Sequence, residues 1–260
     1  MDLEIIERGE SREGHPSLLF VHGYWQAAWT WDEHVMPALA RLGHHCVALS
    51  LRGHGESEGK IRGASISDYV SDIEEVVATL DPAPILLAHS MGGFTAQHYL
   101  AKGNQAHAVV LVSPVPRKGA WGATFRVIAK HPWRFLKANL TLDVGAVVET
   151  SEAAYDFLLS PHDDPSAIDR CMGRLERASY RVYLDLLLNR PDLSAVELPA
   201  LVVGGTEDGF FREREWRDTA RLLNSRVVML EDLGHQPMWE GDGRLLVDAI
   251  DQFVSGLSPS

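Results

Sequence analysis

The chain has 260 residues, with 24 Lys and Arg against 36 Asp and Glu, a formal net charge of −12 and 45% apolar residues. This length and apolar fraction suit one large domain, or a domain with an insertion, and allow a substantial core. The negative charge argues against nucleic acid as a partner, because it repels phosphate backbones. No apolar run approaches the roughly 18 residues of a membrane span, and the charged N-terminus lacks a signal-peptide stretch, so a cytoplasmic location is expected.

Short apolar runs that end at glycine or at a polar turn predict buried strands. They lie at residues 17–23, 45–55, 84–90, 107–114, 199–205 and 226–235. Segments with apolar residues at three-to-four spacing predict helices at residues 31–43, 65–80, 92–103 and 243–257. Strands that alternate with helices indicate an α/β fold, with a mostly parallel sheet covered by helices on both faces.

The alternation of strands and helices stops between residues 115 and 198. This stretch is rich in Trp, Phe and Arg, and its patterns are helical throughout. It is too long for a loop and has no expected strand, so we interpret it as a helical cap inserted over the carboxyl edge of the sheet. The expected domains are therefore an α/β core formed by residues 1–114 and 199–260, and a cap formed by residues 115–198.

The most specific motif is Ala88-His89-Ser90-Met91-Gly92, where an expected strand meets an expected helix. It fits a small-x-Ser-x-Gly pattern, in which small residues two before and two after the serine permit a tight, strained turn. Such a turn lifts the hydroxyl above the sheet edge, and the next N–H points to where an oxyanion would form. The alternative interpretation is a helix-capping serine followed by glycines that serve packing.

Two later loops carry the partners that a serine nucleophile needs, a base and a carboxylate that orients the base. Asp208 follows the fifth expected strand and His235 follows the last one. Glu207 competes with Asp208 as the acid, and the Gly-x-x-Asp spacing from Gly205 favours Asp208. After the first apolar run, Tyr24 is placed to supply a second oxyanion N–H.

These motifs, together with "LRGHGESEG" at residues 51–59, resemble the α/β-hydrolase superfamily over most of the chain. The resemblance implies that Ser90 is the nucleophile, His235 the general base and Asp208 the orienting acid. It also implies that the backbone N–H groups of Tyr24 and Met91 form the oxyanion hole.

The resemblance further implies a serine hydrolase. Because the expected cap is aromatic and aliphatic, the expected substrate is a small to medium carboxylic ester with an apolar acyl or alcohol part. No cofactor is expected. His44 and His45 are adjacent, so on a strand they face opposite ways, and no metal site is expected. The expected substrate contacts are Trp25, Trp121, Phe125, Trp133, Phe157 and Met238. This chain departs from the usual family pattern at Ala88, where glycine is common, and at Gln236.

Other activities use the same fold and triad: lyases, C–C bond hydrolases, cofactor-independent oxygenases and perhydrolases. Residues 22–31, "HGYWQAAWTW", resemble plant-type hydroxynitrile lyases. Those enzymes typically carry a lysine beside the catalytic histidine, where this chain has Gln236, which argues against that activity. A non-enzymatic receptor for a small ligand is the remaining alternative, and the intact triad disfavours it.

Overall fold

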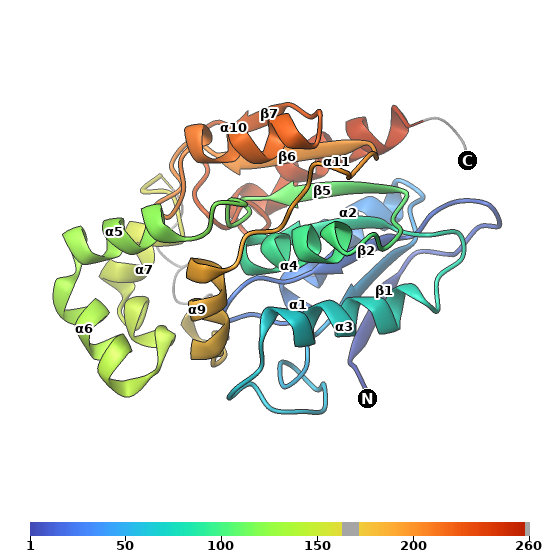
Figure 1. Ribbon diagram of the computed structural model, residues 1–260. Coiled ribbons are helices and arrows are strands. Elements are labelled where there is room, and N and C mark those ends of the chain that lie inside the picture. The colour runs from blue at the N-terminus through green and yellow to red at the C-terminus, as the bar shows by residue number, and fades with distance from the viewer. Residues whose placement is uncertain (163–171, 258–260) are drawn as a thin grey trace.

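The computed structural model describes residues 1–162 and 172–257 and is built around one seven-stranded sheet. The strand order is β1-β3-β2-β4-β5-β6-β7 (Figure 1). The strands are β1 (Ile5–Arg8), β2 (Leu18–Val21), β3 (Cys46–Leu49), β4 (Ile85–His89), β5 (Ala108–Val112), β6 (Ala200–Gly205) and β7 (Val227–Leu230). β1 pairs with β3 in the antiparallel direction, and every other neighbouring pair is parallel.

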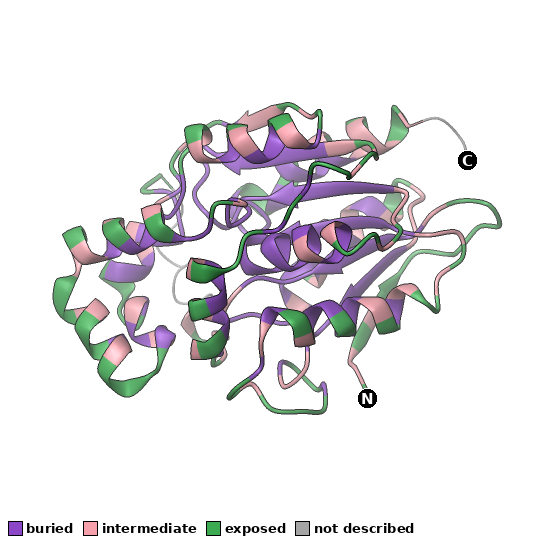
Figure 2. Cartoon of the chain, in the orientation of Figure 1, coloured by how far each residue is buried: buried purple, intermediate pink, exposed green. Residues whose placement is uncertain are grey.

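Each of the six apolar runs contains one strand of this sheet. All residues of β2, β3, β4 and β5 are buried, as expected for parallel strands covered on both faces (Figure 2). The prediction of a mostly parallel α/β sheet is therefore confirmed.

Helices cover both faces of the sheet. Figure 1 shows α3 (Ile66–Val77), α4 (Ser90–Ala101) and α10 (Glu213–Leu222) in front of it, and α2 (Val35–Arg41) and α11 (Arg244–Ser255) behind it. A short turn, η2 (Glu240–Gly243), precedes α11. The start of α3 is a capping box, because the Ser65 hydroxyl accepts the N–H of Asp68 and the Asp68 carboxylate accepts the N–H of Ser65.

The single helix expected at residues 31–43 is divided into α1 (Trp29–Asp32) and α2. Pro37 explains the division, since a proline is tolerated in the first turn of a helix and not in its interior. A second helix that starts at Val35 places Pro37 in its first turn.

Between β5 and β6 the described residues form α5 (Trp121–Lys130), α6 (Pro132–Thr141), η1 (Val144–Val147), α7 (Ser151–Phe157) and α9 (Tyr180–Leu188). Within residues 115–162 and 172–198 there is no strand. These helices extend beyond the carboxyl ends of the parallel strands, at the left of Figure 1. The Asp185 carboxylate of α9 accepts the N–H of Ile66 at 3.0 Å, which joins the inserted helices to the start of α3.

In the part of the chain that the structure describes, no helix combines the length and the apolar character needed to cross a membrane.

Candidate active site

The turn between β4 and α4 has no loop, since β4 ends at His89 and α4 begins at Ser90. Ser90 has a φ of 50°, in the left-handed region that costs a non-glycine residue about 1–3 kcal/mol. A Cβ atom added to Gly92 would lie 2.8 Å from the carbonyl oxygen of Val21, and one added to Gly93 would lie 2.8 Å from Cβ of Pro114. The two glycines are therefore needed for the close approach of α4 to its neighbours.

The structure brings Ser90, His235 and Asp208 together from three separate strand ends. The Ser90 hydroxyl lies 2.9 Å from Nε2 of His235, and Nδ1 of His235 lies 2.8 Å from Oδ2 of Asp208. The serine O–H can donate to Nε2 only when the imidazole carries its hydrogen on Nδ1, which the Asp208 carboxylate accepts. All three residues are buried.

Asp208 is held in place by more than the histidine. Its Oδ1 atom accepts the backbone N–H groups of Phe210 and Phe211, each at 2.8 Å. Its other oxygen is thereby directed to His235. The Glu207 side chain is exposed, and among the described residues no hydrogen bond joins it to His235. The geometry therefore favours Asp208 over Glu207 as the partner of the histidine.

The two candidate oxyanion donors, Met91 and Tyr24, come from α4 and from the loop after β2, where a Cβ atom added to Gly23 would lie 3.1 Å from Cβ of Ser90. Met91 is in the first turn of α4, where backbone N–H groups have no carbonyl partner within the helix. Tyr24 follows β2 and precedes Trp25, which has a φ of 63°. His22 braces this loop, because its Nδ1–H donates to the carbonyl of Gly23 at 2.8 Å and its Nε2 accepts the N–H of Leu51 at 3.0 Å. Burial keeps the pKa of His22 well below its usual value, so the ring is neutral.

His89 helps to hold the loop after β7 that carries His235. Its Nε2–H donates to the backbone carbonyl of His235 at 2.9 Å. Burial, and to a lesser degree the neighbouring His235, hold the pKa of His89 well below its usual value. A neutral His89 adds no positive charge beside the candidate base.

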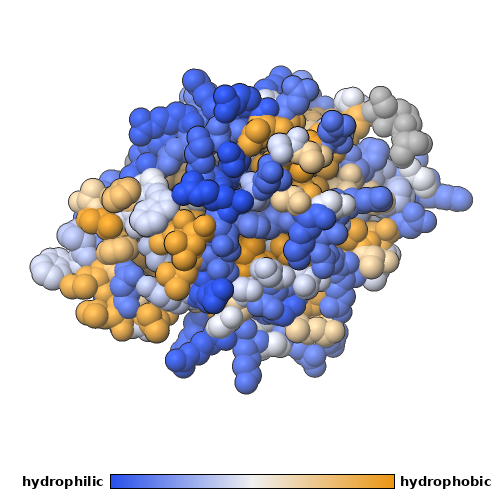
Figure 3. Space-filling model, in the orientation of Figure 1, coloured by the Kyte–Doolittle hydropathy of each residue, from blue (hydrophilic) through white to orange (hydrophobic). Residues whose placement is uncertain are grey.

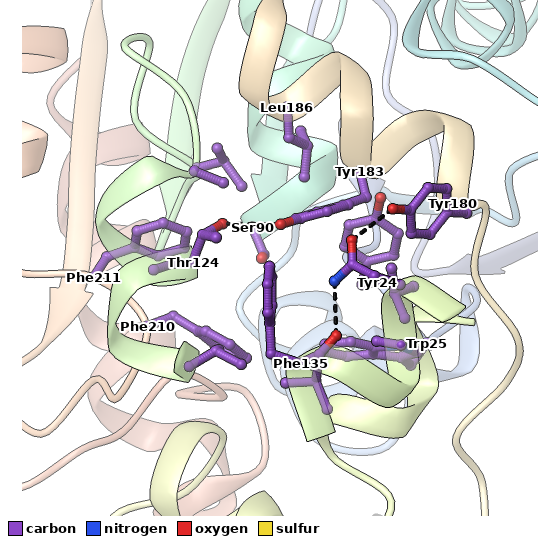
Figure 4. Close-up of a pocket in the computed structure, with 18 residues that line it drawn as sticks. Tyr24, Trp25, Ser90, Thr124, Phe135, Tyr180, Tyr183, Leu186, Phe210 and Phe211 are labelled. Atoms are coloured by element: carbon purple, nitrogen blue, oxygen red, sulfur yellow. Dashed lines mark hydrogen bonds between the residues drawn. The ribbon is translucent and has the colours of Figure 1, made fainter. Parts of the chain in front are cut away.

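Ser90 lines a cavity between the sheet edge and the inserted helices, and this cavity is partly open to solvent. Figure 4 shows that its walls include Trp25, Phe135, Tyr183 and Phe210, which come from the loop after β2, from α6, from α9 and from the loop after β6. The side chains that line it are mostly aliphatic or aromatic. An apolar cavity that contains a few polar groups is typical of a small-molecule site.

Of the six residues expected to contact substrate, only Trp25 lines this cavity. Trp121, Phe125 and Trp133, on α5 and α6, are 42%, 62% and 79% exposed. Figure 3 shows hydrophobic residues gathered on the outer surface at its left, where these helices lie in Figure 1. Phe157 and Met238 have no exposed surface and pack in the core without lining the cavity. The structure places these five residues outside the lining of this cavity: α5 turns Ala123, Thr124 and Val127 to the cavity and its large aromatic side chains to solvent.

Several lining residues were not predicted from the sequence. They are Thr124, Tyr180, Tyr183, Phe210 and Phe211. Tyr180, Tyr183 and Leu186 recur every three residues along α9, so they share one face of that helix. This spacing is a signal in the sequence, although it does not say which face turns inward.

The described residues contain no group of three or more His, Cys, Asp or Glu placed to hold a metal ion. His44 and His45 have separate partners. Nε2 of His44 lies 2.9 Å from the Asp251 carboxylate, and Nδ1 of His45 lies 2.8 Å from the Ser17 hydroxyl.

Comparisons with known proteins agree with this architecture. BpoC of Mycobacterium tuberculosis, provisionally named a non-heme bromoperoxidase, is 33% identical over 239 residues, which cover 86% of this chain and 88% of that protein. Among solved structures, the monoacylglycerol lipase of Paleococcus ferrophilus superposes with a TM-score of 0.73 at 21% identity, covering 98% of this chain and 99% of that chain. An esterase from Exiguobacterium antarcticum superposes with a TM-score of 0.76 at 16% identity, covering 98% and 96%.

A sequence profile of the alpha/beta hydrolase family matches residues 18–249, which include every strand except β1 and all three residues of the candidate triad. The chain therefore belongs to the alpha/beta hydrolase family.

Proposed function

We propose that this protein is a serine hydrolase that cleaves a carboxylic ester through Ser90, His235 and Asp208. The observation that carries the proposal is the unbroken series of hydrogen bonds from Asp208 through His235 to the Ser90 hydroxyl. This series supplies a nucleophile, a base in hydrogen-bond contact with it, and a carboxylate that orients the base.

In the proposed reaction, Nε2 of His235 accepts the Ser90 proton as the hydroxyl oxygen attacks the ester carbonyl. The N–H groups of Tyr24 and Met91 stabilise the tetrahedral oxyanion, each lowering the barrier by about 3 kcal/mol. His235 then returns the proton to the departing alcohol. Water, deprotonated by the same histidine, attacks the acyl-enzyme and releases the acid.

The cavity supports an uncharged substrate with an apolar acyl or alcohol part. None of the residues that line it carries a formal charge at neutral pH, and a buried charge without a partner is strongly disfavoured. We also propose that residues 115–198 act as the cap that selects the substrate, since α5, α6 and α9 supply much of the lining. The esterase and lipase names of the structural neighbours support the same reaction class.

Perhydrolysis is a second candidate, and the name of BpoC is the observation that favours it. Hydrogen peroxide in place of water would attack the acyl-enzyme and release a peracid, and the triad would handle the proton as before. Oxidation of bromide in the presence of a carboxylic acid or ester and hydrogen peroxide would report the peracid. Bromide oxidation that persists in Ser90→Ala would exclude this route.

The decisive experiment for the proposed function is labelling with an organophosphonate, read by mass spectrometry. One phosphonate should add per chain, at Ser90, and Ser90→Ala should lose both labelling and hydrolysis of p-nitrophenyl esters. Ser113→Ala is the matched control, because Ser113 also follows a buried strand and has a φ of 41°. Labelling of Ser113, or full activity in Ser90→Ala, would overturn the proposal; a protein that cleaves no ester and takes no label would be a receptor or a catalyst of another kind.

A further inference from the structure

Four of the polar side chains that line the cavity form two pairs, and the pairs differ in their hydrogen bonding. Beside Ser90, the polar side-chain groups in the lining are the Trp25 and Tyr24 side chains near the oxyanion loop, the pair Asn139–Tyr180, and the pair Thr124–Tyr183. The Tyr24 hydroxyl donates to the carbonyl of Ser179 at 3.2 Å. The two pairs lie between the inserted helices and differ in how many of their hydrogens are engaged.

The pair Asn139–Tyr180 has short hydrogen bonds within the protein. The Tyr180 hydroxyl donates to Oδ1 of Asn139 at 2.7 Å, and Nδ2 of Asn139 donates to the carbonyl of Phe135 at 2.7 Å. The tyrosine donor is therefore engaged, and this pair mainly connects α9 to α6.

In the pair Thr124–Tyr183, one hydroxyl hydrogen has no acceptor among the described residues. The two hydroxyl oxygens are 3.3 Å apart, longer than the usual 2.7–2.8 Å for an O–H···O bond, and neither hydroxyl has another hydrogen bond among the described residues. Two hydroxyls carry two hydrogens, and only one can lie between the oxygens. One O–H therefore remains for a partner in the cavity, which both residues line and where Figure 4 shows their hydroxyls directed toward each other.

We propose that Thr124 and Tyr183 form a binding site for an uncharged oxygen acceptor of the substrate, such as a ketone or ether oxygen in the part of the ester that enters the cavity. The inference rests on the proposed ester hydrolase function and adds a polar requirement to it. The hydrocarbon on either side of that oxygen would contact the aromatic walls, for example Phe135 and Phe210.

The acceptor is uncharged because the cavity offers no positive charge. Its lining residues include no Lys, Arg or His, so a carboxylate would lose its hydration without a counter-charge. Burial raises the pKa of Tyr183 above its usual value, so the phenol keeps its hydrogen at neutral pH. Thr124 is 7% exposed, which limits competition from bulk water.

The test compares p-nitrophenyl hexanoate with its 4-oxo and 5-oxo derivatives. Each kcat/KM is divided by the rate of alkaline hydrolysis of the same ester, because the added carbonyl also changes intrinsic reactivity. Wild type should prefer one oxo ester by about fivefold or more, the factor that one ordinary hydrogen bond supplies. The ratio of the normalised kcat/KM for that oxo ester to the normalised kcat/KM for the unsubstituted hexanoate measures this preference. Tyr183→Phe and Thr124→Val should each reduce the ratio, and the double variant should bring it to about one.

Tyr180→Phe is the matched control for the ratio. It removes a hydroxyl from the same helix and cavity, but one already bonded to Asn139, so the preference for the oxo ester should persist. Three outcomes would overturn the inference: equal normalised kcat/KM for all three esters in wild type, a preference for the oxo ester that survives the double variant, or a preference that Tyr180→Phe also abolishes.

A binding measurement separates this inference from the proposed function. Calorimetric titration of Ser90→Ala with hexanamide and with 4-oxo- and 5-oxohexanamide requires no turnover. One oxo amide should bind about fivefold more tightly, and Tyr183→Phe in the same background should remove the difference. Equal affinities would overturn the site even if esters are cleaved at Ser90, whereas a clear difference without ester turnover would support the site and count against the hydrolase proposal.

Discussion

Gln26 donates a side-chain N–H to the side-chain oxygen of Gln236 at 2.7 Å, and these side chains are 0% and 1% exposed. The Oε1 atom of Gln26 accepts the backbone N–H of Gly23 at 3.2 Å. Gly23 precedes the candidate oxyanion donor Tyr24, and Gln236 follows His235. This amide pair therefore connects the oxyanion loop to the histidine loop without introducing a charge.

We expect Gln236→Leu to lower kcat by roughly tenfold, because it leaves the Gln26 amide buried without its acceptor and frees the oxyanion loop to shift. Gln26→Leu should have a similar effect, and the double variant should cost no more than the more severe single variant, since both remove the same connection. The measurement is steady-state kinetics with p-nitrophenyl butyrate. Fully additive losses in the double variant would show that the two side chains act independently.

The acid is tested by two neighbouring substitutions. Asp208→Asn should lower kcat by roughly 10⁴-fold, as for the aspartate of serine proteases, because the amide would favour the wrong tautomer of His235. Glu207→Gln should cost far less, since Glu207 is exposed and its side chain makes no hydrogen bond to the histidine in the described structure. If the two effects were reversed, the assignment of Asp208 would be wrong.

The strands and the tight turn at Ser90 could be predicted from the sequence because each depends on a strong local constraint. A central parallel strand is buried on both faces, so β2 and β4 are continuous apolar runs. The turn at Ser90 tolerates only small neighbours, since Gly92 approaches the backbone of β2. Such constraints leave a recognisable pattern of residues.

The cavity lining could not be predicted in the same way. Helix α5 carries apolar residues on opposite sides, Trp121 and Phe125 outward and Ala123 and Val127 inward. Periodicity tells which residues share a face, but the face that turns inward depends on tertiary packing. The bond between Gln26 and Gln236 spans 210 positions and has no local signature at all.

Buried histidines predict a loss of stability in mild acid. Burial lowers the pKa of His54 to about 4, and it holds those of His22 and His89 well below the ordinary 6.5. Below pH 6.5 the unfolded chain binds protons that these native histidines do not, so stability falls as the pH falls. With a pKa of about 4 in the native state, His54 should contribute a loss of about 1.4 kcal/mol between pH 7.5 and 5.5, and His22 and His89 should contribute in the same direction.

Urea unfolding at the two pH values measures this loss. His54→Gln removes one of these titrating groups, so the decrease in the free energy of unfolding between pH 7.5 and 5.5 should be about 1.4 kcal/mol smaller than in wild type. The comparison of the two decreases does not depend on how much the substitution itself destabilises the protein. Equal decreases in both proteins would mean that His54 is protonated as readily in the native state as in the unfolded chain.

The cavity also predicts a dependence on the length of the acyl chain. Each buried methylene contributes about 0.8 kcal/mol, so kcat/KM for p-nitrophenyl esters from acetate upward should rise roughly fourfold per carbon until the cavity is full.

Phe135→Ala enlarges the cavity and should move the end of this rise to longer acyl chains. Trp133→Ala is the control on the same helix, since its ring is 79% exposed and lies outside the lining, and it should leave the profile where it is. A profile that is flat in wild type, or that shifts with Trp133→Ala and not with Phe135→Ala, would show that the acyl chain occupies another surface, with the loop at residues 22–29 the next to test.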